Sequence, residues 1–179
     1  MSSDRSRIGP SSDAGLHSRV AEVVRKHQDA LYCLAYRILG RSVDAEEARQ
    51  AVLLKLVERP DVLSEVRSVD AWLKRCVINE AMMLLRGRRR RPEVRLPDFE
   101  CIATDSQCVA EAMRAEQRNM LDVAMQQLDP ELRAMLSLRF DDEMTIREIG
   151  EVMGQPHTTV QSKLERAIKQ LRTLFAQQE

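Results

Sequence analysis

The segment from Thr145 to Leu171 constrains the fold more than any other part of the chain, because helix-starting and helix-ending residues punctuate it at fixed spacings. Thr145 and Glu148 have the spacing of a capping box, which begins a helix. Gly154 suits the left-handed backbone that ends a helix, and Pro156 can begin the next helix without losing a needed N–H. The pattern predicts two helices joined by a short turn, a helix-turn-helix.

The second of these helices has one apolar and one polar side. Val160, Leu164 and Ile168 recur at helical spacing and form its inward stripe. The polar residues between them face outward, where the first turns of such a helix can reach base edges in the DNA major groove. An αα-hairpin with a solvated outer face is the alternative. The residues that we predict to bind DNA are His157, Thr158, Thr159, Gln161, Ser162, Lys163 and Arg166.

Apolar residues recur at helical spacing through most of the remaining chain, and no segment alternates apolar and polar residues as a half-buried strand does. Asp44 and Glu47 offer a second capping box, and Asp129-Pro130 offers an N-cap followed by proline at the first helical position. We therefore predict an all-α fold. The helices expected before the helix-turn-helix cover about 17–39, 44–58, 68–87, 109–128 and 130–140.

Composition divides the chain into two parts. Residues 92–105 hold two prolines and several acidic residues without any periodicity, as a connection between domains does. We predict two small helical domains joined by a flexible linker, the second domain containing the helix-turn-helix. The expected boundaries are a disordered amino terminus at 1–15, a first domain at 16–91, a linker at 92–108 and a second domain at 109–179.

The net charge of the chain is zero, but the charge is distributed unequally between the two halves. Residues 1–91 hold 18 Lys and Arg against 12 Asp and Glu, whereas residues 92–179 hold 10 against 16. A basic first half indicates a polyanionic partner. Because the second half is acidic, any DNA binding there must depend on the local placement of a few basic side chains and not on bulk attraction.

The cysteines and histidines give little support to a metal site. The four cysteines form no C-x-x-C pair and the three histidines lie far apart, so we expect no bound metal. Cys101 and Cys108 either pair under oxidation or stay reduced, as thiols in the cytosol do.

The sequence also lacks membrane and catalytic signals. The amino terminus has no apolar core of a signal peptide, and the longest apolar run, Ala81–Leu85, is far shorter than the ~20 residues that span a bilayer. We find no paired-carboxylate, nucleophile or phosphate-loop motif. We expect a cytoplasmic protein that is not an enzyme, needs no cofactor and does not insert into a membrane.

Two parts of the chain, in a fixed order, resemble one known family. Residues 128–172 resemble the carboxy-terminal promoter-recognition domain of sigma factors, with the sequence LDPELRAMLSLRFDDEMTIREIGEVMGQPHTTVQSKLERAIKQLR. Two stretches of the first half resemble the other sigma domain, with the sequences LYCLAYRILGRSVDAEEARQAVLLKL and AWLKRCVINEAMMLLRGRRRR. The chain is similar to the small, two-domain extracytoplasmic-function type of the sigma-70 family. It departs from the family pattern at Ala51, Leu53, Val57, Met83 and Gln155-Pro156.

The resemblance implies a factor that binds core RNA polymerase and directs promoter-specific initiation of transcription. Residues 16–91 would be the sigma region 2-like domain and residues 109–179 the region 4-like domain, both on promoter DNA. An anti-sigma factor is a further partner expected from the resemblance. The alternatives are a sigma-like interaction module or decoy, and a transcriptional regulator that uses only the helix-turn-helix. A dimeric regulator would bind two-fold half-sites, which a sigma factor does not need.

The resemblance also assigns roles to individual side chains. Asn79 can hydrogen-bond a base edge, basic side chains can neutralise phosphates, and Trp72 fits the apolar stripe of its helix better than a stacking role. Contact with core polymerase is expected at Asp44, Glu47, Arg49 and Gln50. DNA contact in the first domain is expected at Lys74, Arg75, Asn79, Arg86, Arg88, Arg89, Arg90 and Arg91.

Overall fold

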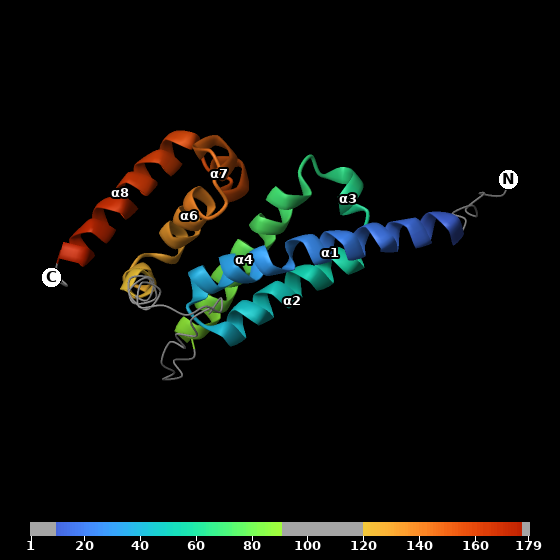
Figure 1. The fold of residues 1–179 in the computed structure, drawn as a ribbon, viewed down its shortest axis with the longest axis horizontal. Helices are drawn as coiled ribbons and strands as arrows, with labels where there is room; N and C mark the ends of the chain where they lie inside the picture. The colour runs from blue at the N-terminus through green and yellow to red at the C-terminus, as the bar shows by residue number, and fades with distance from the viewer. Residues whose placement is uncertain (1–9, 91–119, 177–179) are drawn as a thin grey trace, which may run out of the picture.

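The computed structural model describes residues 10–90 and 120–176, and within these ranges the chain forms helices and no strand (Figure 1). This confirms the all-α prediction. The predicted linker at 92–108, the beginning of the helix predicted at Val109, and both Cys101 and Cys108 lie outside the described residues. The helices are α1 (Pro10–Leu39), α2 (Ser42–Glu58), α3 (Val62–Glu65), α4 (Val69–Arg90), α6 (Pro130–Phe140), α7 (Ile146–Met153) and α8 (His157–Ala176). Residues 120–126 are helical as well.

The first half is a group of three long helices. α1 packs against both α2 and α4, and α2 also packs against α4 (Figure 1). Each helix buries one apolar stripe, which is what its sequence spacing predicts. The buried stripes consist of Leu31, Leu34, Ala35 and Ile38 on α1, of Ala45, Ala48, Val52 and Leu56 on α2, and of Leu73, Val77 and Ala81 on α4.

Three details of the first half differ from the sequence predictions. α1 begins at Pro10, so residues 10–15 are helical and not disordered. α3 lies between the helices expected at 44–58 and 68–87, where the sequence predicts no helix. α2 begins at Ser42 without a side-chain cap, so the capping box predicted at Asp44 does not form. Asp44 lies buried inside the first turn of α2, where its carboxylate faces Arg41 and Arg88.

The second half shows the predicted helix signals directly. The side chain of Asp129 accepts from the amide of Glu131 at the start of α6. At the start of α7, the hydroxyl of Thr145 accepts from the amide of Glu148, whose carboxylate in turn accepts from the Thr145 amide at 2.8 Å. Gly154 ends α7 with φ of 66°. The carbonyl of Pro156 accepts the first hydrogen bonds of α8. These contacts confirm the helix-turn-helix.

Gly150 has a steric role in this turn. A Cβ built on Gly150 would lie 2.8 Å from the backbone oxygen of Gln155, closer than side chains approach a carbonyl. Gly150 therefore lets the turn fold back closely on α7, where the Gln155 amide donates to the Gly150 carbonyl at 2.9 Å.

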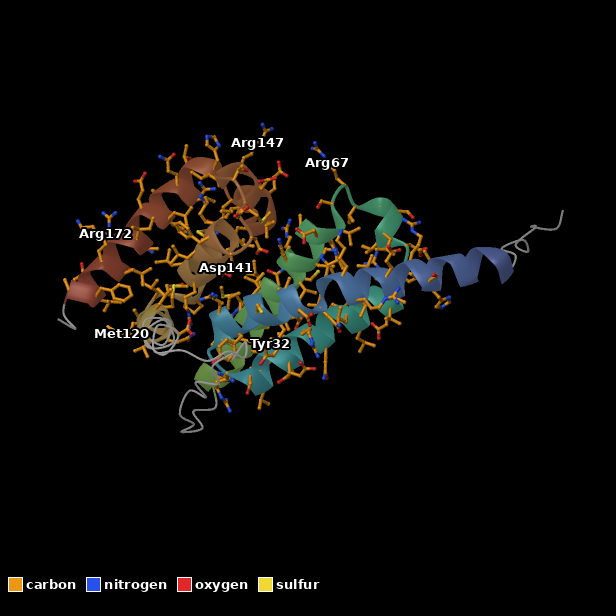
Figure 2. All side chains as sticks on the ribbon, in the orientation of Figure 1. Tyr32, Arg67, Met120, Asp141, Arg147 and Arg172 are labelled. Carbon is orange, nitrogen blue, oxygen red and sulfur yellow. The ribbon has the colours of Figure 1, made fainter. Side chains whose placement is uncertain are left out.

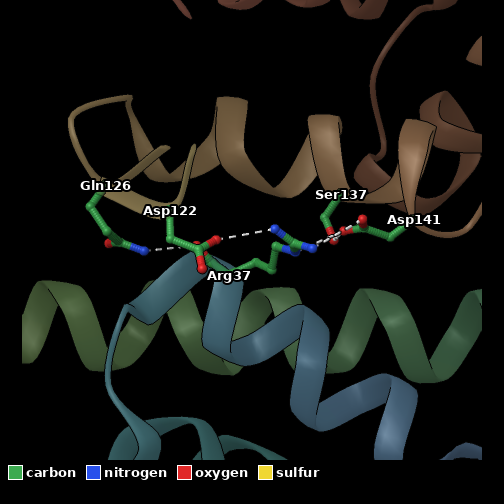
Figure 3. Close-up of polar contacts among 5 residues, drawn as sticks. All are labelled: Arg37, Asp122, Gln126, Ser137 and Asp141. Carbon is green, nitrogen blue, oxygen red and sulfur yellow. Dashed lines mark hydrogen bonds and ion pairs between the residues drawn. The ribbon is translucent and has the colours of Figure 1, made fainter. Parts of the chain in front are cut away.

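The two halves pack against each other. α6 contacts α1, α7 contacts α4, and the buried apolar residues of the halves form one continuous core. Arg37 near the end of α1 bridges Asp122 and Asp141, and the amide of Gln126 donates to the Arg37 carbonyl at 3.2 Å (Figure 3). Asp141 lies where α6 meets the first group of helices (Figure 2). The acidic turn after α6 thus binds basic side chains of the first half.

Candidate nucleic-acid interface

Most of the residues predicted on the outer face of α8 are exposed. His157, Thr158, Gln161, Ser162 and Arg166 are solvent-accessible, whereas Thr159 and Lys163 are partly buried. The inner stripe of α8 consists of Val160, Leu164 and Ala167, with Ile168 packed at its edge. The exposed face of α8 is therefore the one that the sequence predicts, apart from Thr159 and Lys163.

Lys163 points toward α6. Its ammonium donates to a carboxylate oxygen of Glu131 at 2.7 Å and to the amide oxygen of Gln155 at 3.0 Å. The Gln155 amide also donates to the second oxygen of Glu131. Gln155 stands in the turn, where the family pattern has an apolar residue, and its polarity is accounted for by these two hydrogen bonds.

Sequence reasoning missed an acidic residue on the exposed face of α8. The amide of Gln161 donates to the carboxylate of Glu165 at 3.1 Å, and both side chains are exposed. The spacing of four residues on one helix is the signal that could have found this pair. The face thus combines amide, hydroxyl, basic and acidic groups and is not uniformly basic.

On α4, Arg75, Asn79 and Arg86 are exposed, as predicted. Arg75 lies beside the end of α7, since its guanidinium is 3.3 Å from the place that a Cβ on Gly154 would take. Arg86 also donates to the carbonyl of Met82 at 3.1 Å. These side chains form an exposed polar row along α4.

The outward position predicted for Lys74 is wrong. Its side chain is only 9% exposed, and its ammonium lies 3.0 Å from Asp70 on the same helix and 2.9 Å from Asp142 of the acidic turn. The reason is the packing of α7 on α4, which covers this side of the helix. Burial alone would lower the pKa of Lys74, but hydrogen bonds to Asp142 and Asp70 outweigh burial and raise the pKa above its ordinary value.

The basic end of α4 is only partly free. Arg88 pairs with the buried carboxylate of Asp44, and burial together with the nearby charge of Arg41 lowers the pKa of Arg88. The backbone of Arg89 and Arg90 continues α4. Their side chains and the whole of Arg91 lie outside the described residues.

The residues predicted to contact polymerase divide into buried and exposed. Asp44 is buried, so its predicted surface position is wrong, whereas Glu47 and Gln50 are exposed. Arg49 is partly buried, donates to Glu46 at 2.5 Å and lies 5.8 Å from the centre of the Tyr32 ring.

Sequence reasoning also missed an apolar row on α2. Val43, Leu54 and Val57 are 64%, 57% and 55% exposed. They fall on the same side of the helix as Glu47 and Gln50, because all five are separated by three or four residues. We call these five residues the α2 stripe. It is out of phase with the buried side of α2, and this phase difference was readable from the sequence.

The described residues offer little for a metal or a membrane. They contain no group of three His, Cys, Asp or Glu side chains that could hold a metal ion. No helix among them is long and apolar enough to cross a bilayer.

The chain matches two family models and several characterised proteins. Residues 23–91 match the model of sigma-70 region 2, and residues 124–173 match that of sigma-70 region 4. The RNA polymerase sigma-E factor of Streptomyces avermitilis is 33% identical over 153 residues, which cover 84% of this chain and 82% of the relative. The ECF RNA polymerase sigma factor SigW of Bacillus subtilis is 28% identical, covering 85% of this chain and 86% of the relative.

Two solved structures share the fold. One is the sigma factor RpoE in complex with the anti-sigma factor NepR from Bartonella quintana, with a TM-score of 0.71 and 18% identity over 87% of this chain and 96% of that chain. The other is CnrH in complex with the cytosolic domain of CnrY, with a TM-score of 0.65 and 18% identity over 91% of each chain. The chain therefore belongs to the sigma-70 family of RNA polymerase sigma factors, in which the extracytoplasmic-function members direct the polymerase to promoters.

Proposed function

We propose that the α2 stripe is the surface through which this sigma factor binds core RNA polymerase. The observation that carries this assignment is the row of three large apolar side chains left in solvent beside Glu47 and Gln50. An exposed apolar row with a polar margin on a single helix suits a partner helix or groove. Arg49, which is partly buried, stabilises this part of α2 through its contacts with Glu46 and Tyr32. Asp44 acts by fixing Arg41 and Arg88 and not by touching the partner.

In the proposed arrangement, promoter DNA contacts both halves. Along α4, Asn79 supplies hydrogen bonds to a base edge, and Arg75 and Arg86 neutralise phosphates. Arg88 is held by Asp44, but the basic residues that follow it, Arg89, Arg90 and Arg91, add contact with backbone phosphates that does not depend on sequence. Lys74 is not part of this surface in the present arrangement, because Asp142 and Asp70 occupy its ammonium.

For the second half we propose that α8 reads the upstream promoter element in the major groove. Gln161 can pair with adenine and Arg166 with guanine or phosphate, and both side chains are exposed. His157, Thr158, Thr159 and Ser162 lie in the first turns, where helix amides also favour a phosphate.

The expected inhibitory partner is an anti-sigma factor. Support comes from the two structures that share this fold, one a complex with an anti-sigma factor and the other a complex with the cytosolic domain of CnrY. We further propose that the chain acts in the cytoplasm, where core polymerase is found, and that it catalyses no reaction of its own.

The α2 stripe is tested with a matched pair of substitutions. Leu54→Ser should weaken binding to core polymerase by about tenfold, since central apolar contacts contribute more than ~1 kcal/mol. Met83→Ser is the control, because Met83 is as exposed as Leu54, 57%, but lies on α4. Affinities are measured by titrating labelled sigma factor with core enzyme. If the two variants bind core polymerase with equal affinity, the α2 stripe is not part of the interface.

A further inference from the structure

Three side chains from separate elements close a ring of hydrogen bonds at the base of α8. Glu131 comes from the first turn of α6, Gln155 from the turn of the helix-turn-helix, and Lys163 from the second turn of α8. The Lys163 ammonium lies 2.7 Å from one Glu131 oxygen and 3.0 Å from the Gln155 oxygen. Because the Gln155 amide donates to the other Glu131 oxygen, each member of the ring contacts both others.

The ring is partly sheltered from water. The side chains of Lys163 and Glu131 are 25% and 31% exposed. Burial alone would raise the pKa of Glu131, but hydrogen bonds from Lys163 and Gln155, with the nearby charges of Lys163 and Arg166, hold that pKa below its ordinary value. Glu131 is therefore ionised at neutral pH and offsets the charge of Lys163 where the two side chains meet.

Arg166, the other cation predicted on this face, is in a different position. It is exposed on α8, whereas Lys163 is directed toward α6. A phosphate that recruited Lys163 would have to break two hydrogen bonds and leave a carboxylate behind. Contacts of Lys with phosphate carry no sequence information and strengthen binding to all DNA alike.

We propose that Glu131 and Gln155 are positioning residues that withhold Lys163 from DNA phosphates, and that they thereby set the contrast between promoter and other DNA. This inference rests on the proposed role of α8 in promoter binding. Sequence-independent attraction is kept low by the ring, while the exposed side chains Gln161 and Arg166 supply the sequence-dependent contacts. The polar residue in the turn, Gln155, serves this purpose by tying Lys163 to the turn as well as to α6.

The test uses holoenzyme assembled from the full chain and core polymerase. Equilibrium binding is measured over a series of salt concentrations, for a promoter fragment and for a non-promoter fragment of equal length. Glu131→Gln should tighten binding to both fragments, reduce their affinity ratio and steepen the log–log salt dependence by up to ~0.9, the value of one phosphate contact. Glu131→Asp keeps the charge and should stay close to the unaltered protein. Gln155→Leu should act in the same direction as Glu131→Gln but less strongly, because the Lys163–Glu131 pair is retained.

Substitution of Lys163 distinguishes a specific role of this side chain from a general effect of the changed net charge. Lys163→Met should leave the salt dependence of the otherwise unaltered protein unchanged. The double variant Glu131→Gln with Lys163→Met carries the same charge change at Glu131, yet it should lose the steeper slope. If Lys163→Met alone flattens the slope by about 0.9, Lys163 already binds phosphate and the inference is wrong. The Lys163→Met measurement tests the inference even if Glu131→Gln fails to fold.

The outcome also distinguishes the inference from the function on which it rests. Unaltered holoenzyme that shows no preference for any promoter fragment would refute the role of α8 in promoter binding. A clear promoter preference, with a salt slope that Glu131→Gln leaves unchanged, would refute only the withholding of Lys163.

Discussion

Replacing Asp142 by asparagine should weaken the contact between the two halves of the molecule, because Asp142 is the partner that the acidic turn offers to buried Lys74. The ammonium of Lys74 is 2.9 Å from this carboxylate, and the side chains are 9% and 19% exposed. Removing one member of a buried pair costs about 3–5 kcal/mol when nothing else balances the charge left behind. Asp70 stays in place 3.0 Å away, so we expect a loss of about 1–3 kcal/mol in the free energy of unfolding.

A double-mutant cycle isolates this contact. Asp142→Asn, Lys74→Met and the double variant are compared by urea unfolding of the full chain, followed by circular dichroism. Because the two groups touch, their coupling energy should be about 1–2 kcal/mol. Asp29→Asn, at an exposed carboxylate of α1, is the matched control and should leave stability within about 0.5 kcal/mol of the unaltered protein. A coupling energy below about 0.3 kcal/mol would show that the acidic turn does not pair with Lys74 of α4 in solution.

Further predictions concern the helix-turn-helix. Gly150→Ala should destabilise the chain by about 1–3 kcal/mol in thermal or urea unfolding, because the new methyl group would meet the carbonyl of Gln155 at 2.8 Å. Gly87→Ala, on an open stretch of α4, should instead raise stability by about 0.5–1 kcal/mol, and equal effects at both glycines would contradict the steric reading. Thr145→Ala should cost about 0.5–2 kcal/mol through loss of the cap on α7, measured in the same way. Glu131 has a pKa below its ordinary value of 4.5, so its stabilisation is complete above pH 4.5 and is lost as the pH falls through the lower pKa of the folded state. The stability difference between the unaltered protein and Glu131→Gln should therefore shrink as the pH falls below about 4.5, and a constant difference would count against the ring.

The helix-turn-helix was predictable because its signals are local. Thr145, Gly154 and Pro156 act on the backbone within a few residues of themselves, and the structure has each of them in the predicted place. The all-helical fold was predictable for the same reason, since every long helix carries its own apolar stripe.

The positions of Lys74 and Asp44 were not predictable from local spacing. Lys74 looks like a surface residue on its own helix, and only the approach of Asp142, 68 positions later in the chain, buries it. Asp44 looks like a helix cap, but it lies buried in the first turn of α2 beside Arg88, 44 positions away. Both outcomes depend on how helices pack against one another, which the period of a single helix does not specify.

The α2 stripe lies between these cases. Val43, Leu54 and Val57 are apolar at helical spacing, but they are out of phase with Ala48 and Val52, which face the core. A second apolar row on an amphipathic helix indicates a surface that binds a partner, and this row can be recognised from the sequence alone.

The central claim, that this chain directs RNA polymerase to promoters, is tested most directly by transcription in vitro. Purified core polymerase is mixed with a library of genomic fragments, with and without the full chain, and transcript starts are mapped. We predict that the chain adds a defined set of starts that share an upstream sequence, and that Gln161→Ala or Arg166→Ala relaxes selectivity at particular upstream base pairs by about 1–3 kcal/mol while core binding is kept. Core binding without any specific start, or no binding to core at all, would contradict the account.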